Sequence, residues 1–95
     1  MTIISEISQT IGISEKELIE KGLESFIEKE IRLVARDIAD ICERYNVASK
    51  EDLYNAIASG SVAGHPAWED YIVWKNKEIY LRELKNYLKK IKLKL

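Results

Sequence analysis

The sequence is poor in the residue types that carry catalysis, metal binding or cross-linking. Its 95 residues include one cysteine (Cys42), one histidine (His65) and one proline (Pro66). A single cysteine excludes a disulfide within the chain, and no spaced set of Cys and His ligands for zinc is present. Glycine-rich phosphate loops and HExxH motifs are absent too. We therefore expect a protein that is not an enzyme and that holds no metal or other cofactor.

Long apolar runs are also missing. No stretch reaches the roughly 18 apolar residues of a membrane-spanning helix, and no basic segment precedes an apolar run at the N-terminus. Hydrophobic residues make up 46% of the chain and charged residues 33%, which is typical of a folded domain. We expect a cytoplasmic protein with neither a membrane nor a small-molecule substrate as partner. The abundance of Ile, Leu, Lys and Glu is typical of thermophiles.

Helical signals fill most of the chain. Ser14 and Glu17 form a capping box, Gly12 and Asn46 are typical helix stops, and Pro66 suits a first helical turn. These signals predict an all-α fold, with one domain over residues 1–95 and four helices at about 3–11, 14–45, 50–59 and 66–93. Two helices are short and two are long.

The first long helix has two apolar stripes. Ile19, Gly22, Phe26 and Leu33 form one; Leu23, Ile27, Ile31, Val34, Ile38, Ile41 and Tyr45 form the other. A helix with two apolar faces needs two neighbours. We expect one neighbour to be the other long helix, packed antiparallel, and the other to be a second copy in a dimeric helical bundle. Gly22 is expected to admit the short first helix closely.

The last helix changes its apolar face along its length. Its first stripe is Trp68, Tyr71, Ile72 and Ile79; its second is Tyr80, Leu84, Tyr87, Leu88 and Ile91. Either the helix bends near Ile79 or its two halves pack on different partners. Trp74 and Leu81 fit neither stripe, so we expect Trp68 in the core and Trp74 as an exposed anchor for a protein partner.

Charge is divided between the two halves. Residues 1–48 carry ten acids and six bases, a net of −4, while residues 49–95 carry six acids and nine bases, a net of +3. Antiparallel long helices would bring the acidic block at residues 15–30 beside the lysines of the tail. An alternative is that these lysines bind nucleic acid. They are Lys89, Lys90, Lys92 and Lys94.

Residues 3–23 follow a helix-turn-helix pattern, with Gly12 at the turn and Ser14 opening the second helix. That second helix carries four glutamates within its first ten residues, against Lys16 and Lys21. A phosphate backbone would repel this acidic excess. A structural corner is therefore favoured over a DNA-reading one.

The remaining residues of interest have unremarkable explanations. Cys42 is expected to pack as a small apolar residue, and His65 could cap the last helix. We expect the protein interface to combine aromatic residues with the apolar rows of the long helices. Its predicted residues are Trp68, Tyr71, Trp74, Ile27, Ile31, Val34, Ile38, Leu84, Leu88 and Ile91.

The segment from Gly64 to Lys75, GHPAWEDYIVWK, follows an opening Ile11-Gly12-Ile13-Ser14 and a Ser49–Leu53 helix start. In helix order and in this short stretch the chain resembles small archaeal-type helical proteins regarded as antitoxin-like. The resemblance implies a non-enzymatic protein that neutralises a partner toxin by direct binding. Two alternatives stay open: a helix-turn-helix DNA-binding regulator, and a purely structural homodimerisation or adaptor module.

Overall fold

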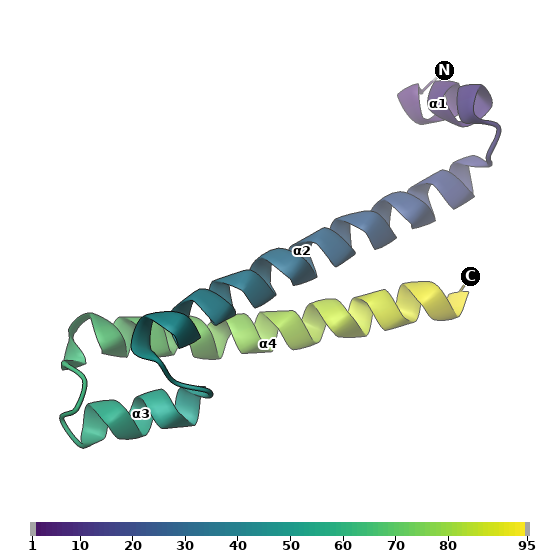
Figure 1. Cartoon of the computed structure of the whole chain (residues 1–95). Coiled ribbons are helices and arrows are strands. Elements are labelled where there is room, and N and C mark those ends of the chain that lie inside the picture. Colours follow the sequence, from purple (N-terminus) through teal and green to yellow (C-terminus); the bar gives the residue numbers. More distant parts are fainter. Residues whose placement is uncertain (1, 95) are drawn as a thin grey trace.

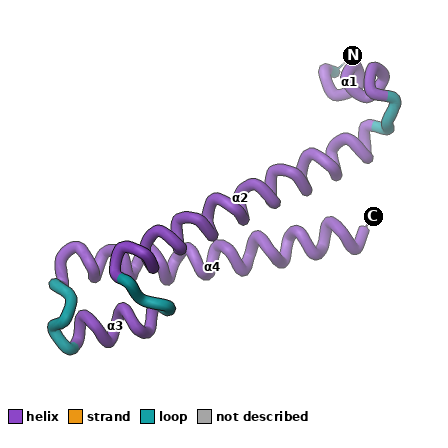
Figure 2. Tube along the Cα trace, viewed as in Figure 1, coloured by secondary structure: helices purple, strands orange, loops and turns teal. Residues whose placement is uncertain are grey.

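The computed structural model describes residues 2–94 and is helical throughout, with no strand in that range (Figures 1 and 2). The elements are α1 (Ile3–Ile11), α2 (Glu15–Tyr45), α3 (Lys50–Ala58) and α4 (Gly64–Lys94). The expected all-α class is confirmed. Within α4, His65 has non-helical backbone angles, so the regular helix begins beside Pro66.

Short-range hydrogen bonds set the helix ends. The Ser14 hydroxyl accepts a bond of 3.0 Å from the Glu17 N–H, and the Ser49 hydroxyl accepts one of 3.1 Å from the Asp52 N–H. Each satisfies a backbone donor that has no partner within the helix. Gly12 and Asn46 have positive φ values of 84° and 52°, and these left-handed conformations end α1 and α2.

Helices α2 and α4 form an antiparallel hairpin, and α3 packs beside its closed end (Figure 1). Ion pairs join the two long helices at intervals. They are Arg44–Asp70 at 2.9 Å, Lys77–Asp37 at 2.9 Å and Lys92–Glu28 at 3.7 Å. Ion pairs near the surface contribute little to stability, so these pairs set the register of the two helices more than the stability.

The core lies at the closed end, where three helices meet. Its buried members are Ile41 from α2, Leu53 and Ile57 from α3, and Ala67 and Trp74 from α4. Towards the open end α2 and α4 diverge, and α1 lies at the far end of α2 (Figure 1). The chain is consequently elongated: its radius of gyration is 19.4 Å, against about 12 Å for a compact domain of this length.

The inward face of α4 is one continuous row, which corrects the expected change of face. Every member is buried or half-buried, in steps of three or four residues, which is the period of helices packed side by side. The row is Ala67, Tyr71, Trp74, Glu78, Leu81, Leu84, Leu88 and Ile91. Trp74 and Leu81, which fit neither predicted stripe, connect its two halves. Between Pro66 and Lys94 no residue has non-helical backbone angles, so the two halves need no separate partners.

The inward row of α2 begins at Ile27 and packs towards α4 within the same chain. Val34 and Ile41 are buried, and Ile27, Ile31 and Ile38 are half-buried. The sequence assigned Ile27, Ile31, Val34, Ile38, Leu84, Leu88 and Ile91 to an interface with another chain. Contacts between the two helices cover this row in part. Its half-buried members keep some exposed surface, so their role at an interface with another chain stays a prediction.

Candidate functional site: an aromatic cluster at the closed end

Three aromatic rings from two helices meet on the surface of the closed end. Tyr54 comes from α3, and Trp68 and Tyr71 come from α4. The ring centroids of Tyr54 and Trp68 lie 5.5 Å apart, and Trp68 and Tyr71 lie 5.8 Å apart, both edge to face. Tyr54 and Tyr71 are 5.8 Å apart. Such arrangements are favourable beyond their area of burial, so the three rings fix one another. We call these residues the aromatic cluster.

Neighbouring residues in the sequence place each ring. Leu53 faces the core, so Tyr54, the next residue along α3, is turned to the surface. In the same way the buried Ala67 leaves Trp68 half outside. Gly64 gives the indole room: a Cβ there would lie 3.3 Å from Trp68 Cδ1. Tyr71 packs against the core from its inner side and joins the cluster to it.

The cluster borders a shallow hollow lined by Glu51, Tyr54, Asn55 and Tyr71. The Glu51 carboxyl is held in its charged form, because its own backbone N–H and the neighbouring Lys50 ammonium lower its pKa. Two aromatic rings beside a carboxylate and an amide form a setting suited to a cationic side chain with an apolar stem. The hollow therefore combines two aromatic walls with one carboxylate and one amide.

The burial expected for the two tryptophans is reversed in the structure. Trp74, predicted to be the exposed anchor, is 2% exposed and belongs to the core, while Trp68, predicted to be in the core, is 40% exposed. The inward row of α4 determines which tryptophan is buried. Trp74 lies seven positions from both Ala67 and Leu81 and shares their face of the helix, whereas Trp68 lies one position after Ala67 and faces outward. Tyr71 lies between core and surface, and its interface role stays a prediction.

Trp74 also anchors α3 beneath the cluster. Its indole N–H donates to one oxygen of Glu78 at 3.0 Å, and the other oxygen of Glu78 accepts from the Lys50 ammonium at 2.8 Å. Lys50 is the first residue of α3, so this chain of contacts fixes the start of α3 to α4. It thereby holds Tyr54 against Trp68. The Glu78 contact raises the pKa of Lys50, which keeps this link charged.

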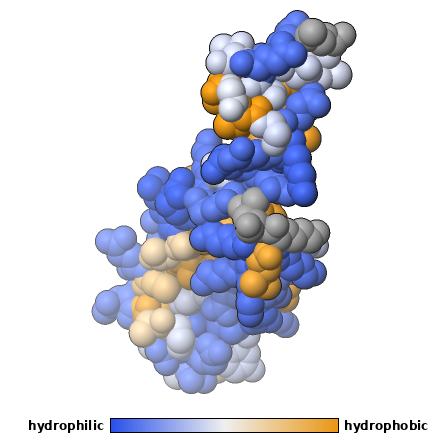
Figure 3. Space-filling model, turned by 90° about the vertical axis from the view of Figure 1, so that its right-hand side faces the viewer, coloured by the Kyte–Doolittle hydropathy of each residue, from blue (hydrophilic) through white to orange (hydrophobic). Residues whose placement is uncertain are grey.

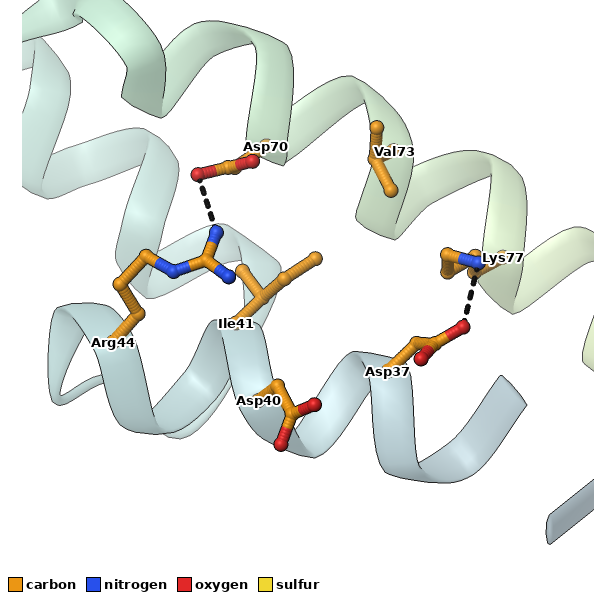
Figure 4. A pocket seen from close by; sticks show the side chains of 7 residues that line it. All are labelled: Asp37, Asp40, Ile41, Arg44, Asp70, Val73 and Lys77. Carbon is orange, nitrogen blue, oxygen red and sulfur yellow. Dashed lines mark hydrogen bonds and ion pairs between the residues drawn. The ribbon is translucent and has the colours of Figure 1, made fainter. Parts of the chain in front are cut away.

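A second concave surface lies along the seam between α2 and α4 (Figure 4). Its charges pair with each other across the seam: Arg44 with Asp70, and Lys77 with Asp37. Asp40 lines the same groove but points away from both pairs (Figure 4). The phenol of Tyr45 also donates to Asp70. These contacts hold the two helices together, and we assign the seam a structural role.

The Tyr45–Asp70 contact predicts weaker folding at alkaline pH. Burial, followed by the hydrogen bond to Asp70, raises the pKa of Tyr45 above its ordinary value of 10.0. The unfolded chain therefore loses this proton first, and the free energy of unfolding should fall as the pH rises above about 10. Urea unfolding at about pH 8 and about pH 10.5 would measure the fall. We expect Tyr45→Phe to reduce it without abolishing it, because a bond to Glu30 also raises the pKa of Tyr80; an equal fall in both proteins would contradict the assignment.

His65 and Cys42 have different surroundings. The His65 imidazole is exposed, and its Nδ1 lies 3.1 Å from a carboxylate oxygen of Glu69, one turn along α4. Cys42 packs against the core cluster, as expected for a small apolar residue. Across residues 2–94, no three His, Cys, Asp or Glu side chains come together in a way that could hold a metal ion.

The two regions predicted as alternative nucleic-acid binding sites are the basic tail and the N-terminal corner. Lys89, Lys90 and Lys92 are exposed, while the side chain of Lys94 lies outside the described residues. Lys92 pairs with Glu28, and the Lys90 ammonium lies 5.7 Å from the ring centroid of Tyr87. Helices α1 and α2 do meet in a corner at Gly12 (Figure 1), yet α2 opens with an acidic first turn.

No helix within residues 2–94 combines the length and the apolar character needed to cross a membrane.

The chain belongs to the family described as the uncharacterized protein MJ0235 family, whose model matches residues 1–95. The match covers the whole chain and carries no association with toxins or antitoxins. Neither the curated proteins nor the solved structures include a match.

Proposed function

We propose that this member of the MJ0235 family is a protein-binding module that acts in the cytoplasm, catalyses no reaction, and holds its partner on the aromatic cluster. The observation that carries the proposal is the exposure of Trp68 and Tyr54 in a fixed arrangement on a rigid base. Tryptophan and tyrosine are the residues most enriched among those that dominate binding energy at protein interfaces. Rings already fixed by their neighbours lose little conformational entropy on binding.

The partner that fits this surface presents a basic side chain. Glu51 and Asp52 lie in the first turn of α3 and Glu69 follows Trp68 in α4, so three acids stand within three positions of Tyr54 or Trp68 in the sequence. A lysine or arginine in the hollow would contact Tyr54 and Tyr71 with its stem and Glu51 with its charge. The resemblance of residues 64–75 to antitoxin-like proteins makes a toxin encoded nearby the first partner to test.

No observation favours the DNA-binding alternative over this one. A recognition helix would begin at Glu15, and three more glutamates follow by residue 24. Such a helix approaches phosphates unfavourably. The structural homodimerisation alternative is compatible with a cluster that binds a partner, because self-association can use a different surface.

Substituting Trp68 tests the proposal. We expect Trp68→Ala to weaken the complex by about 2 kcal/mol or more, roughly thirty-fold in Kd, because it removes the exposed centre of the cluster. The partner would first be identified by co-purification with the tagged chain, and its Kd then measured by calorimetry with purified proteins. Val73→Ala, at an exposed apolar position of the same helix outside the cluster, is the matched control.

If the partner is a toxin, the same variants also predict the outcome of a cell-rescue experiment. Co-expression of the wild-type chain should rescue cells from the partner, and Trp68→Ala should fail to do so at equal expression. Equal binding by Trp68→Ala and Val73→Ala would exclude the cluster as the interface. If binding is lost as expected but cells are never rescued, the partner is not a toxin.

A further inference from the structure

Helix α1 turns its polar residue inward and its apolar residues outward. Ser8 is the buried residue of this helix, 8% exposed, and its hydroxyl donates to the carbonyl oxygen of Ile13 at the turn. The isoleucines of α1 are exposed, Ile11 at 60%; they are Ile3, Ile4, Ile7 and Ile11. A helix that had all its neighbours within its own chain would show the opposite arrangement. The apolar face of α1 has no cover within the described chain.

The start of α2 continues this uncovered surface. Ile19, Leu23 and Phe26 are all exposed, Phe26 at 61%. We call residues 3–26, which comprise α1 and the first turns of α2, the N-terminal arm. Figure 3 shows it as a lobe that rises from the body of the molecule, with apolar residues on its surface. An isolated apolar patch of this kind typically marks an interaction site.

Gly22 lies in the middle of the exposed stripe of α2. The sequence led us to expect that it would admit α1 closely, and this is wrong: a Cβ at Gly22 would meet nothing within 4 Å. Glycine inside a helix costs about 1 kcal/mol relative to alanine. No neighbour within residues 2–94 makes use of the space. A second backbone that approached the stripe at this point would explain the cost.

The surface area points the same way. The chain exposes 6857 Å², whereas a compact monomer of 11.0 kDa would expose about 5,600 Å². The excess of about 1,200 Å² exceeds the roughly 800 Å² that each partner contributes to a standard interface. The chain therefore has enough uncovered surface to form a stable dimer with a second copy.

We propose that a second copy of this chain docks on the N-terminal arm, with the two α2 helices crossing antiparallel about a two-fold axis close to Gly22. In such a pair, a residue seven positions after Gly22 lies near the residue seven positions before it on the other copy. Those residues are Lys29 and Glu15, which are both exposed and make no ion pair within the described chain. The two-fold symmetry would form this ion pair between Glu15 and Lys29 twice, once on each side of the axis.

The two-fold arrangement also covers the apolar residues. Phe26 would lie against the stretch around Ile19 of the other copy, since both are about four positions from the axis. The isoleucines of α1 would flank the crossing. This interface lies at the open end of the hairpin and the aromatic cluster at the closed end (Figure 1), so the dimer neither rests on the proposed partner binding nor competes with it.

Light scattering on the full chain across a dilution series tests the dimer. We expect a mass of about 22 kDa, twice the 11.0 kDa of one chain, at micromolar concentration. Phe26→Glu should raise the Kd at least about thirty-fold and give the monomer mass, because it places charges in the apolar contact. Ile72→Glu, an equally exposed apolar position at the closed end, is the matched control and should stay dimeric. Circular dichroism would verify that both variants keep their helix content.

Two outcomes would overturn the proposal. One is a wild-type chain that stays at 11 kDa up to about 100 μM, a concentration at which any dimer of biological affinity would be visible. The other is a dimer that survives Phe26→Glu as well as it survives Ile72→Glu, which would move the interface away from the arm. Either result would leave the proposed partner binding at the aromatic cluster untouched.

A cross-link tests the position of the axis. In a Cys42→Ala background, Gly22→Cys should form a disulfide between the two copies under mild oxidation, since a residue near a two-fold axis faces itself. Ala39→Cys, exposed on α2 beyond the arm, is the control and should cross-link slowly. Equal rates would contradict a crossing near Gly22. Exchanging the charges of Glu15 and Lys29 together should preserve the dimer better than reversing Glu15 alone.

Discussion

Replacing Trp74 with alanine is expected to lower the free energy of unfolding by about 3–5 kcal/mol. The indole is 2% exposed and is one of the largest fully buried side chains of the described chain. The substitution would lose the transfer free energy of the buried indole, and it would leave a cavity where α2, α3 and α4 meet. A domain of this length is stabilised by only about 5–10 kcal/mol in total, so the change should remove a large part of it.

Urea unfolding followed by circular dichroism would measure the loss, and the second tryptophan supplies the control. Trp68→Ala removes the same side chain from the same helix at a position that is 40% exposed. We expect it to cost about 1 kcal/mol, because the lost ring is already partly in water. Equal costs for the two substitutions would contradict the burial assigned here.

A milder variant keeps the test informative if Trp74→Ala does not fold. Trp74→Phe retains an aromatic ring but removes the N–H that donates to Glu78. We expect a smaller loss, about 1–2 kcal/mol, because Glu78 lies near the surface, where water can replace the missing donor. Since Glu78 also holds Lys50, the same variant should loosen the start of α3.

The helix ends and the inner row of α2 could be predicted from sequence because their signals are local. Ser14 and Ser49 cap helices through residues three positions away, and Gly12 and Asn46 stop them through their own backbone angles. From Ile27 to Tyr45 the inner row of α2 is apolar at nearly every step, so its period is visible without knowledge of the partner.

The inner row of α4 escaped prediction because two of its members do not look like core residues. Glu78 occupies an inward position as a charged residue, where it bonds to Trp74 and Lys50, and Ala67 is too small to mark a stripe. Without these two positions the remaining apolar residues divide into two faces, and Trp74 lies outside both. Charged residues at inward positions hide the period from any count of apolar residues.

The aromatic cluster depends on tertiary packing and could be predicted only in part. Trp68 and Tyr71 were singled out by their closeness in sequence, but Tyr54 was missed, since it lies on another helix and reaches them only because α3 folds back on α4. Gly22 was noticed for its cost in a helix, yet its neighbour was assigned wrongly. Which helix lies beside a given face is a long-range property that local patterns do not carry.

Replacing Leu53 with alanine is expected to release α3 while the rest of the hairpin remains folded. Leu53 is fully buried, and with Ile57 it forms the apolar attachment of α3 to the core. Its truncation should cost about 2–5 kcal/mol. A helix of nine residues is marginal in water without packing, so α3 should lose most of its structure when this contact is weakened.

Amide hydrogen exchange would locate the effect. We expect the amides of α3 to lose protection in Leu53→Ala, while those near Val34 and Leu84, where α2 and α4 pack without α3, keep theirs. Ala58→Gly, at the exposed end of the same helix, is the matched control and should leave Leu53 and its contacts in place. Uniform loss of protection along α2 and α4 would instead show that the chain unfolds as one cooperative unit.

The same variant separates the two proposed surfaces. Once α3 is released, Tyr54 leaves Trp68 and the hollow beside Glu51 disappears, so partner binding should fall as far as it does in Trp68→Ala. The N-terminal arm lies at the other end of the hairpin (Figure 1), and the dimer mass should not change. If dimerisation and partner binding were lost together in Leu53→Ala, with exchange still normal near Val34, the two surfaces would have to be energetically coupled along α2 and α4.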